Sequence, residues 1–454
     1  MAKWVRTRLE TGHRNAPGLV VDARKAHQAF RPVPVVGIAE RIAFRALTEW
    51  VVADLELTER SPEEYRSFVA GPIQHAFPQE NLGMKLSDAQ VEYVVHADIA
   101  SYYQYVDHGV LLAELENRTG KVDAARLLIE LLGEVQGTTY GLPQLLDPSD
   151  KLSEIYIQAL ERDVVRRLGA AWRYNDDFRL AVNGYGNAQQ ALEELSAAAR
   201  PLGLVLNDRK SMILKFSTYF WRYAIGEAEE ADVEINPTEI EVWVEDYPDL
   251  DSEGLLQTAG ATFDQLSSGD EFQIDLTNAS PDQVKDLRRA FNIASREQSP
   301  IGLPHVEQVF RFLPQLTPRL ADYLVTMHDA ERDADSVWDA LVARSGAFNT
   351  WQRAWLTYVA RRCAFLDTDR VTWIRGQFED APPGLLHAEA AIALALAGEM
   401  DFATLDTALR TQAEALAPWY AIAINHVTAT AEQRSAVRGS SRLYELLISP
   451  PAGK

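Results

Sequence analysis

Three aspartates give the clearest indication of chemistry in this 454-residue chain. Asp176 and Asp177 are adjacent and lie between apolar flanks typical of β-strands, and Asp98 ends the apolar, β-rich run Tyr93–Asp98. Adjacent aspartates alone most often form a turn. With a third carboxylate at the end of a neighbouring strand, they could instead hold two hard divalent ions that promote phosphoryl transfer. We therefore predict that Asp98, Asp176 and Asp177 are catalytic and bind two Mg²⁺ ions, which Mn²⁺ could replace.

These aspartates occur within an ordered set of sequence blocks. Gly141–Ser149 lies between Asp98 and the box Tyr174–Asp177, and Pro201–Lys210 follows that box. In this order the blocks resemble the palm of reverse transcriptases, in which the first aspartate and a Tyr-x-Asp-Asp box supply the metal ligands. Weaker matches to the primer grip and to the fingers of the same enzymes are found at Phe216–Gly226, Gln28–Val36 and Glu40–Leu47.

The resemblance implies roles for residues that would bind a nucleotide. Tyr103, five residues after Asp98, matches the aromatic residue that rejects a ribose 2′-hydroxyl, so the implied substrate is a dNTP. Gln144 would contact the incoming nucleotide. Arg31, helped by neighbouring basic residues, would hold the triphosphate, because arginine pairs with phosphate in a bidentate way. Taken alone, each residue also fits an ordinary structural or surface role.

Two further roles are implied close to the aspartates. Lys210 would be the general acid that protonates the pyrophosphate leaving group. A solvated lysine at the end of a loop is an equally consistent interpretation of the same residue. The backbone carbonyl of Ile99 would complete the coordination shell of the metal.

The distribution of charge departs from that of an enzyme that holds a long duplex. The net charge is −22, although residues 1–48 carry nine Lys and Arg against three Asp and Glu, as expected of a phosphate-binding segment. Tyr223–Val284 contains seventeen Asp and Glu and no Lys or Arg, where a basic thumb would be expected. In addition, Leu145 replaces the glycine at which the family lets the template strand approach. Both features argue against template-directed synthesis.

The chain is predicted to have an α+β fold with three parts. Residues 1–226 would form the fingers and palm, residues 227–279 an acidic connector with a β-hairpin at Asp232–Asp246, and residues 280–454 an all-helical domain. The helical periodicity of this last part is typical of an α-solenoid with HEAT-like repeats, although an irregular bundle fits nearly as well. One cysteine, Cys363, excludes a disulfide framework and a cysteine-based zinc site. The sequence contains no membrane span or signal peptide, which favours the cytoplasm.

A palm joined to C-terminal helices resembles the bacterial abortive-infection and defence-associated reverse transcriptases. The resemblance implies antiphage defence through DNA synthesis from dNTPs, without a template and primed by a protein hydroxyl. It also implies a single-stranded DNA product attached to the protein, a homo-oligomer, and no membrane partner. The alternatives are a reverse transcriptase templated by a bound non-coding RNA and a palm-derived scaffold that binds proteins. A nucleotide cyclase is less consistent with the blocks around the aspartates.

Overall fold

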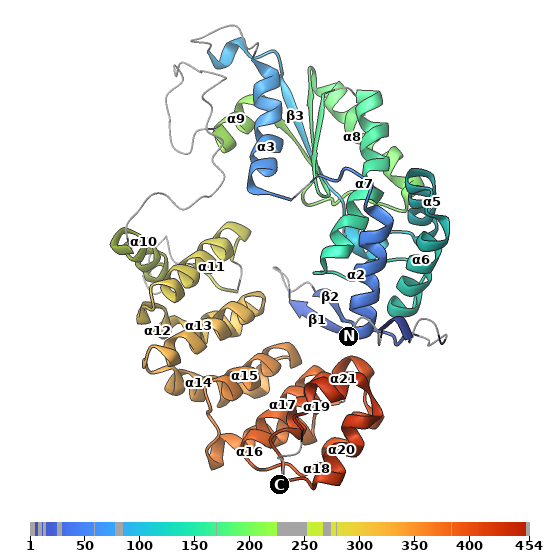
Figure 1. Cartoon of the computed structure of the whole chain (residues 1–454). Helices are drawn as coiled ribbons and strands as arrows, with labels where there is room; N and C mark the ends of the chain where they lie inside the picture. Colours follow the sequence, from blue (N-terminus) through green and yellow to red (C-terminus); the bar gives the residue numbers. More distant parts are fainter. Residues whose placement is uncertain are drawn as a thin grey trace. The chain divides into compact units, whose positions relative to one another are not determined.

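The computed structural model describes residues 5–7, 11, 15–24, 30–58, 60–77, 85–168, 170–224, 252–266, 274–277, 279–382 and 384–450 (Figure 1). By its internal contacts the chain divides into two units. One unit is Glu40–Tyr247, and the other combines Met1–Ala39 with Pro248–Lys454. We call them the sheet unit and the helical unit.

The sheet unit is built on a four-stranded antiparallel sheet in its described part. The strand order is β4-β5-β3-β6, with β3 (Tyr93–Asp98) in the interior beside β5 (Asp177–Val182). The outer strands are β4 (Ala171–Tyr174) and β6 (Met212–Lys215). The register of β3 and β5 places Asp98 opposite Asp177. Consequently, two of the three predicted ligands meet at one end of the sheet.

Helices of the sheet unit cover the sheet and supply its apolar core. Helices α3 and α8 both pack against strands, and α7 packs against α8 and β4. Val94, Val95 and Ala97 of β3 are fully buried, as is Leu180 of β5. The helices are α2 (Ile38–Val52), α3 (Pro62–Ala76), α4 (Tyr102–Tyr105), α5 (His108–Thr119), α6 (Val122–Gln136), α7 (Asp147–Leu168), α8 (Tyr185–Ala199) and α9 (Phe216–Ala224), with short 3-10 turns at Leu86–Asp88 and Arg200–Leu202.

The helical unit combines a β-hairpin with a succession of short helices. Strands β1 (Leu19–Arg24) and β2 (Phe30–Val35) pair in antiparallel fashion, and β1 contacts α15. Helices α11, α13, α15, α17 and α19 pack one on the next in that order. The helices are α10 (Ser252–Asp264), α11 (Pro281–Arg296), α12 (Leu303–Phe312), α13 (Thr317–Asp329), α14 (Ala334–Val342), α15 (Thr350–Arg362), α16 (Thr368–Glu379), α17 (Leu385–Leu396), α18 (Phe402–Thr411), α19 (Ala417–Ile424), α20 (Ala431–Ser440) and α21 (Arg442–Leu447).

Large buried side chains and capped helix ends explain why these short helices are formed. Trp338, Tyr323 and Phe310 have no exposed surface, and the indole of Trp338 donates a hydrogen bond to the carbonyl of Leu356 at 2.9 Å. Reciprocal capping boxes begin three of the described helices, at Ser280, Asn349 and Thr430. Each box satisfies backbone donors that a helix start leaves without partners.

Several predictions about the fold can be compared with this architecture. The mixed α+β class and the helical character of residues 280–450 are confirmed. The contacts group the N-terminal hairpin with the C-terminal helices, although the sequence suggested one domain for residues 1–226; those domain boundaries stay a prediction. The expected hairpin at Asp232–Asp246 lies outside the described residues. No helix in the described ranges is long and apolar enough to cross a membrane.

Gly71 provides a test of how α3 packs on the sheet. A Cβ atom at this position would lie 2.3 Å from the indole nitrogen of Trp172 on β4, which is too close for any side chain. We expect Gly71→Ala to lower the free energy of unfolding by about 1–3 kcal/mol through overpacking. Gly133→Ala on α6 is the matched control, since its Cβ would meet only an ordinary contact. There, helix propensity should raise stability by about 0.5–1 kcal/mol. Equal effects in urea unfolding would contradict this packing.

Candidate active site

A tight hairpin and a strand end bring the three aspartates together. Strands β4 and β5 are joined by a turn of two residues, Asn175 and Asp176, because Tyr174 pairs directly with Asp177. Asn175 has a φ of 54°, in the left-handed region that asparagine tolerates better than most residues. The N–H of Ile99, just after β3, donates to the carbonyl of Asp176 at 3.1 Å. This bond ties the turn to the end of β3.

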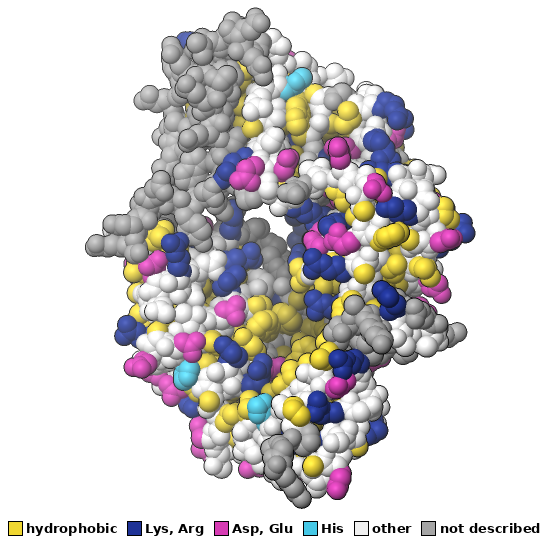
Figure 2. All heavy atoms as spheres, in the orientation of Figure 1, with side chains coloured by type: hydrophobic (Ala, Val, Ile, Leu, Met, Phe, Trp, Pro, Cys, Tyr) yellow, Lys and Arg dark blue, Asp and Glu magenta, His cyan; other side chains and the backbone are white. Residues whose placement is uncertain are grey.

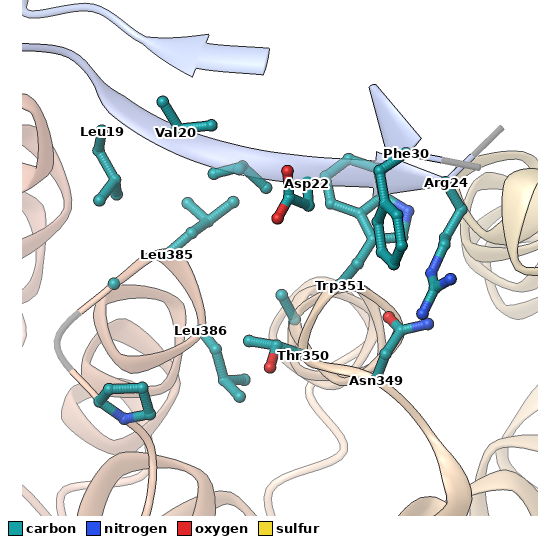
Figure 3. A pocket seen from close by; sticks show the side chains of 14 residues that line it. Leu19, Val20, Asp22, Arg24, Phe30, Asn349, Thr350, Trp351, Leu385 and Leu386 are labelled. Carbon is teal, nitrogen blue, oxygen red and sulfur yellow. The ribbon is translucent and has the colours of Figure 1, made fainter. Parts of the chain in front are cut away.

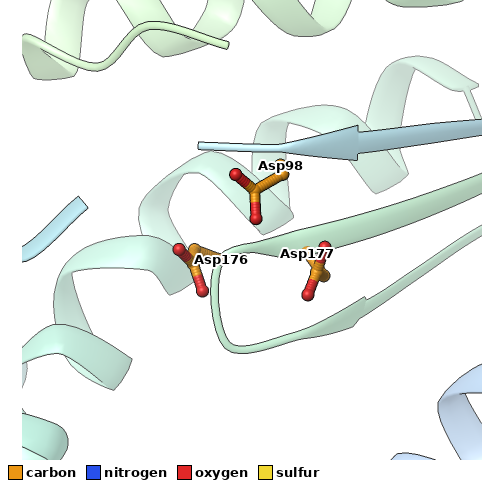
Figure 4. A group of neighbouring side chains, drawn as sticks. All are labelled: Asp98, Asp176 and Asp177. Atoms are coloured by element: carbon orange, nitrogen blue, oxygen red, sulfur yellow. The ribbon is translucent and has the colours of Figure 1, made fainter. Parts of the chain in front are cut away.

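The three carboxylates form a compact cluster that fits a divalent cation. One oxygen each from Asp98, Asp176 and Asp177 lies within 4.8 Å of the others, and the side chains converge from β3 and the β4–β5 hairpin (Figure 4). Asp98 is buried, and the other two are partly exposed. An all-oxygen donor set with several negative charges is what Mg²⁺ and Mn²⁺ prefer. The residues therefore fit the predicted metal, although the arrangement does not specify which ion.

Asp98 is hydrogen-bonded by two residues from the segment that precedes β6, one of which, Lys210, is charged. Its Oδ1 accepts from Nζ of Lys210 at 2.8 Å, and its Oδ2 accepts from the side-chain amide of Asn207, also at 2.8 Å. The N–H of Asn207 also donates to the backbone carbonyl of Asp98 at 2.7 Å. Burial alone would lower the pKa of Lys210, but the hydrogen bond to Asp98 and the nearby aspartates raise it. Lys210 is therefore a cation at neutral pH.

The surroundings of Asp176 disfavour its ionised form. Burial, followed by the charges of Asp98 and Asp177, raises the pKa of Asp176 to about 6. Beside it, Nε2 of His96 lies 3.6 Å from Oδ1 of Asp177. Burial lowers the pKa of His96, although Asp177 opposes that shift, so the imidazole supplies little positive charge at neutral pH. A bound cation would offset the repulsion from Asp98 and Asp177, which adds to the effect of burial on the pKa of Asp176.

A buried ion pair holds the turn that carries Asp176. The guanidinium of Arg173 on β4 makes a two-branched contact with Glu154 of α7, with distances of 2.5 and 3.1 Å, and both side chains are almost fully buried. Nε of Arg173 donates to Oε2 of Glu161 at 2.8 Å. Nη1 of Arg173 also donates to the backbone carbonyl of Asn175 at 3.1 Å. Helix α7 therefore fixes the hairpin at the position where two aspartates project.

The other residues predicted from the sequence lie in several different elements of the structure. Tyr103 lies on α4, partly exposed, and its hydroxyl contacts Asp150 at 2.5 Å. Gln144 and Leu145 form the turn before α7, and Leu145 has a φ of 64° with 68% of its surface exposed. Arg31 lies on β2 in the helical unit, so its proposed role toward the nucleotide stays a prediction.

Two contacts near the cluster were missed by sequence reasoning. Asn207 lies in a block that the sequence identified, yet its bond to Asp98 depends on the path of the chain before β6. Arg60 lies before α3 and contacts Tyr103 and Asp150, with Nη1 at 2.6 Å from the tyrosine hydroxyl. No motif in the sequence marks this arginine.

A separate cavity of about 330 Å³ lies within the helical unit (Figure 3). It is bounded by β1 and by the beginnings of α15 and α17, and most of its lining is aliphatic or aromatic. Asp22 and Arg24 are its charged residues, and the guanidinium of Arg24 lies 3.9 Å from the ring centre of Phe30. This lining differs in kind from the carboxylate cluster of the sheet unit.

The exposed charges of both units are of mixed sign. Figure 2 shows Lys and Arg side chains interspersed with Asp and Glu over the described residues of the visible face. Several of these charges are paired, as in the contacts of Arg126 with Glu116 and of Arg370 with Asp339. Pairing with carboxylates lowers the net positive potential that an arginine offers to a phosphate backbone.

Two solved structures illustrate how distantly this chain resembles known proteins. Neither a protein-family model nor a curated protein matches the chain. Telomerase from Candida albicans, in complex with a fragment of telomeric RNA, has 12% identity and a TM-score of 0.35, with 82% of this chain and 67% of that chain covered. Apo telomerase from Candida tropicalis has 10% identity and a TM-score of 0.36, with coverages of 82% and 72%. Scores at this level do not establish a shared fold, so no assignment follows from them.

The raised pKa of Asp176 predicts a stability effect that depends on pH. Because the pKa in the folded state lies above the ordinary value of 3.8, ionisation of Asp176 destabilises the metal-free protein. The penalty is absent below about pH 4 and complete above about pH 6. We expect Asp176→Asn to raise the free energy of unfolding by about 2 kcal/mol at pH 8 in EDTA, and to have little effect at pH 4.

Urea unfolding at the two pH values would measure this difference. Asp208→Asn, at an exposed position, is the control and should change stability little at either pH. Added Mg²⁺ should stabilise the unaltered protein more than Asp176→Asn, since a ligand that binds only the folded state raises its stability. A loss of stability at pH 8, or an equal gain at both pH values, would show that ionisation of Asp176 does not destabilise the folded protein.

Proposed function

We propose that the chain is a nucleotidyltransferase of the reverse-transcriptase superfamily that adds dNTPs to a hydroxyl group. The observation that carries this proposal is the convergence of Asp98, Asp176 and Asp177 at one end of an antiparallel sheet. Three carboxylate oxygens within 4.8 Å of one another are unfavourable without a cation, and the Lys210 ammonium lies at the same place. Phosphoryl transfer in two-metal sites uses carboxylate ligands of this kind, and a nearby ammonium can donate a proton to the leaving group.

The chain's own residues have distinct parts in this reaction. Asp98, Asp176 and Asp177 hold Mg²⁺ or Mn²⁺, with the carbonyl of Ile99 as a further ligand. When bound, the ions lower the pKa of the attacking hydroxyl and stabilise charge on the transferred phosphate and on the leaving group. Lys210 is protonated at neutral pH and is held at the cluster by Asp98, so it can give a proton to the pyrophosphate leaving group.

Selection of the nucleotide falls to residues that match nucleotide-binding blocks of the family. Tyr103 is the steric gate that favours deoxyribose, and Gln144 contacts the incoming nucleotide from the turn before α7. Arg31 holds the triphosphate. These assignments rest on the match of each residue to its sequence block. For Tyr103 they are also supported by its position on α4, directly after the strand end that carries Asp98.

Synthesis is proposed to be independent of a template and primed by a hydroxyl of the protein. Leu145 supports this, because a bulky and exposed side chain occupies the turn at which the family places glycine. The net charge of −22 also disfavours a long duplex. The resemblance to defence-associated enzymes adds a role in antiphage defence, in the cytoplasm and as a homo-oligomer, with single-stranded DNA attached to the protein as product. The alternatives are synthesis templated by a bound non-coding RNA and a scaffold without polymerase activity.

Incorporation of labelled dNTPs tests the reaction directly. Purified protein is incubated with Mg²⁺ and each labelled dNTP, without added template or primer, before and after RNase treatment, and analysed by denaturing electrophoresis. We expect label that migrates with the polypeptide, survives RNase and is absent from Asp176→Asn. Because that variant should be at least as stable as the unaltered protein, its inactivity would not reflect unfolding.

The same experiment separates the alternatives. Label found only in free DNA, and only while co-purified RNA is intact, would show templated synthesis. No incorporation with any dNTP, together with unchanged antiphage protection by Asp176→Asn, would favour the scaffold.

Leu145→Gly tests whether this side chain limits the use of a template. Glycine adopts the left-handed backbone of this turn without a Cβ clash, so stability should stay within about 1 kcal/mol of the unaltered protein or increase. We expect Leu145→Gly to increase dNTP incorporation when an RNA template and DNA primer are added. Leu145→Ala also shortens the side chain but keeps the unfavourable backbone, and it should give the same increase with no gain in stability. Unchanged incorporation in both variants would show that Leu145 does not limit template access.

A further inference from the structure

Arg60 and Asp150, which have no part in the proposed reaction so far, form a polar cluster with Tyr103. Nη1 of Arg60 lies 2.6 Å from the hydroxyl of Tyr103 and 2.9 Å from Oδ1 of Asp150. The hydroxyl of Tyr103 donates to the same carboxylate oxygen at 2.5 Å. Nη2 of Arg60 donates to Oγ of Ser153 at 2.7 Å. The tyrosine hydroxyl is therefore bonded on both sides, as donor to a carboxylate and as acceptor from a guanidinium.

The bonds constrain the ring as well as the hydroxyl. Burial raises the pKa of Tyr103 to about 12, so the hydroxyl keeps the proton that it donates to Asp150. The backbone carbonyl of Tyr103 accepts from the N–H of Leu142 at 2.8 Å. Next to it, the buried Tyr102 donates to the carbonyl of Ser153 at 2.5 Å, and the two tyrosine rings meet edge to face. The short helix α4 is thereby fastened to the first turns of α7.

The contacts among Arg60, Asp150 and Tyr103 should contribute little to the stability of the fold, but they constrain the orientation of the Tyr103 side chain. The side chain of Arg60 is 27% exposed and that of Asp150 is 41% exposed. Ion pairs open to water to this extent typically contribute about 0–1 kcal/mol. By contrast, a planar guanidinium with two branches in use fixes the direction of its partners. A side chain that discriminates between substrates must be held to within about 0.5 Å, and such a clamp can provide that precision.

We propose that Arg60 and Asp150 are positioning residues that clamp the Tyr103 ring where it excludes a ribose 2′-hydroxyl. The inference rests on the proposed polymerase function and adds to it two residues that set sugar specificity. Arg60 comes from the loop between α2 and α3, whereas Asp150 comes from α7. The clamp thus joins segments on both sides of the α4 tyrosine. Without Arg60 or Asp150 the ring would take several positions, and a ribonucleotide could enter.

Arg60→Gln tests the clamp through sugar discrimination. The measurement is the ratio of kcat/KM for a dNTP to that for the matching NTP. We expect this ratio to fall about tenfold, which corresponds to loss of one charge-assisted hydrogen bond. Asp150→Asn and Tyr103→Phe should lower it to a similar degree. The double variant Arg60→Gln/Tyr103→Phe should lower it no further than either change alone, because both act through one hydroxyl.

Two controls separate positioning from general damage. Arg126→Gln removes another surface arginine that is paired with a glutamate, and it should leave the ratio unchanged. Arg60→Lys keeps the charge but lacks the second branch, so it should restore part of the discrimination. Partial unfolding would reduce both efficiencies together and would not change their ratio.

A binding measurement makes the result independent of turnover. The affinities of the unaltered protein and Arg60→Gln for a dNTP and for the matching NTP are compared in Ca²⁺. A preference for the dNTP that is lost in Arg60→Gln supports the clamp even if no incorporation is seen, an outcome that would contradict only the proposed reaction. An unchanged preference in both Arg60→Gln and Asp150→Asn would overturn the clamp, whether or not the protein polymerises. If neither nucleotide binds, the clamp and the proposed function are both overturned.

Discussion

Repulsion among three neighbouring carboxylates is the constraint on which the arrangement of the sheet unit depends. The backbone brings Asp98, Asp176 and Asp177 together through strand pairing and the bond between Ile99 and Asp176. Only Asp98 has a lysine and an amide directly on its two oxygens. Burial, together with the charges of Asp98 and Asp177, raises the pKa of Asp176. Three carboxylates this close together have the donor set that a hard divalent cation prefers.

The ion pair between Arg173 and Glu154 keeps this unfavourable cluster in place. Burying two charges is costly, and such pairs often add little net stability compared with well-packed apolar side chains. Here the ion pair fixes the position of the turn that carries Asp176, because Arg173 also donates to the carbonyl of Asn175 in that turn. Helix α7 thus takes part in two arrangements, since it also provides Asp150 and Ser153 beside Tyr103. One helix aligns the predicted metal ligands and the predicted sugar gate.

Much of the site could be predicted because its residues follow strand ends and recognisable blocks. Asp98 ends an apolar run, and Asp176 and Asp177 lie between two strand-forming segments, so each was predicted beside a strand end. The resemblance of the ordered blocks to a polymerase palm implied that these strand ends meet, and the register of β3 and β5 brings Asp98 opposite Asp177. The C-terminal helices could also be predicted, from the helical spacing of their apolar residues. The role of Arg60 could not be predicted, because a single arginine in a connecting loop belongs to no periodic pattern. Its partners Tyr103 and Asp150 lie 43 and 90 residues away along the chain. The grouping of the N-terminal hairpin with the distant C-terminal helices likewise depends on long-range contacts that local patterns do not encode.

The pairing of Asp98 with Asp177 has a consequence for how the carboxylate cluster forms during folding. Side chains alternate between the two faces of a sheet, so a slip of β5 by one residue would turn its carboxylate to the opposite face. The strands that must align are joined by α4 to α7 and β4, a long connection whose closure is slow compared with that of a local hairpin. Nascent or misregistered chains would therefore lack the cluster altogether. The cluster should therefore form late in folding, when the two strands pair in the correct register.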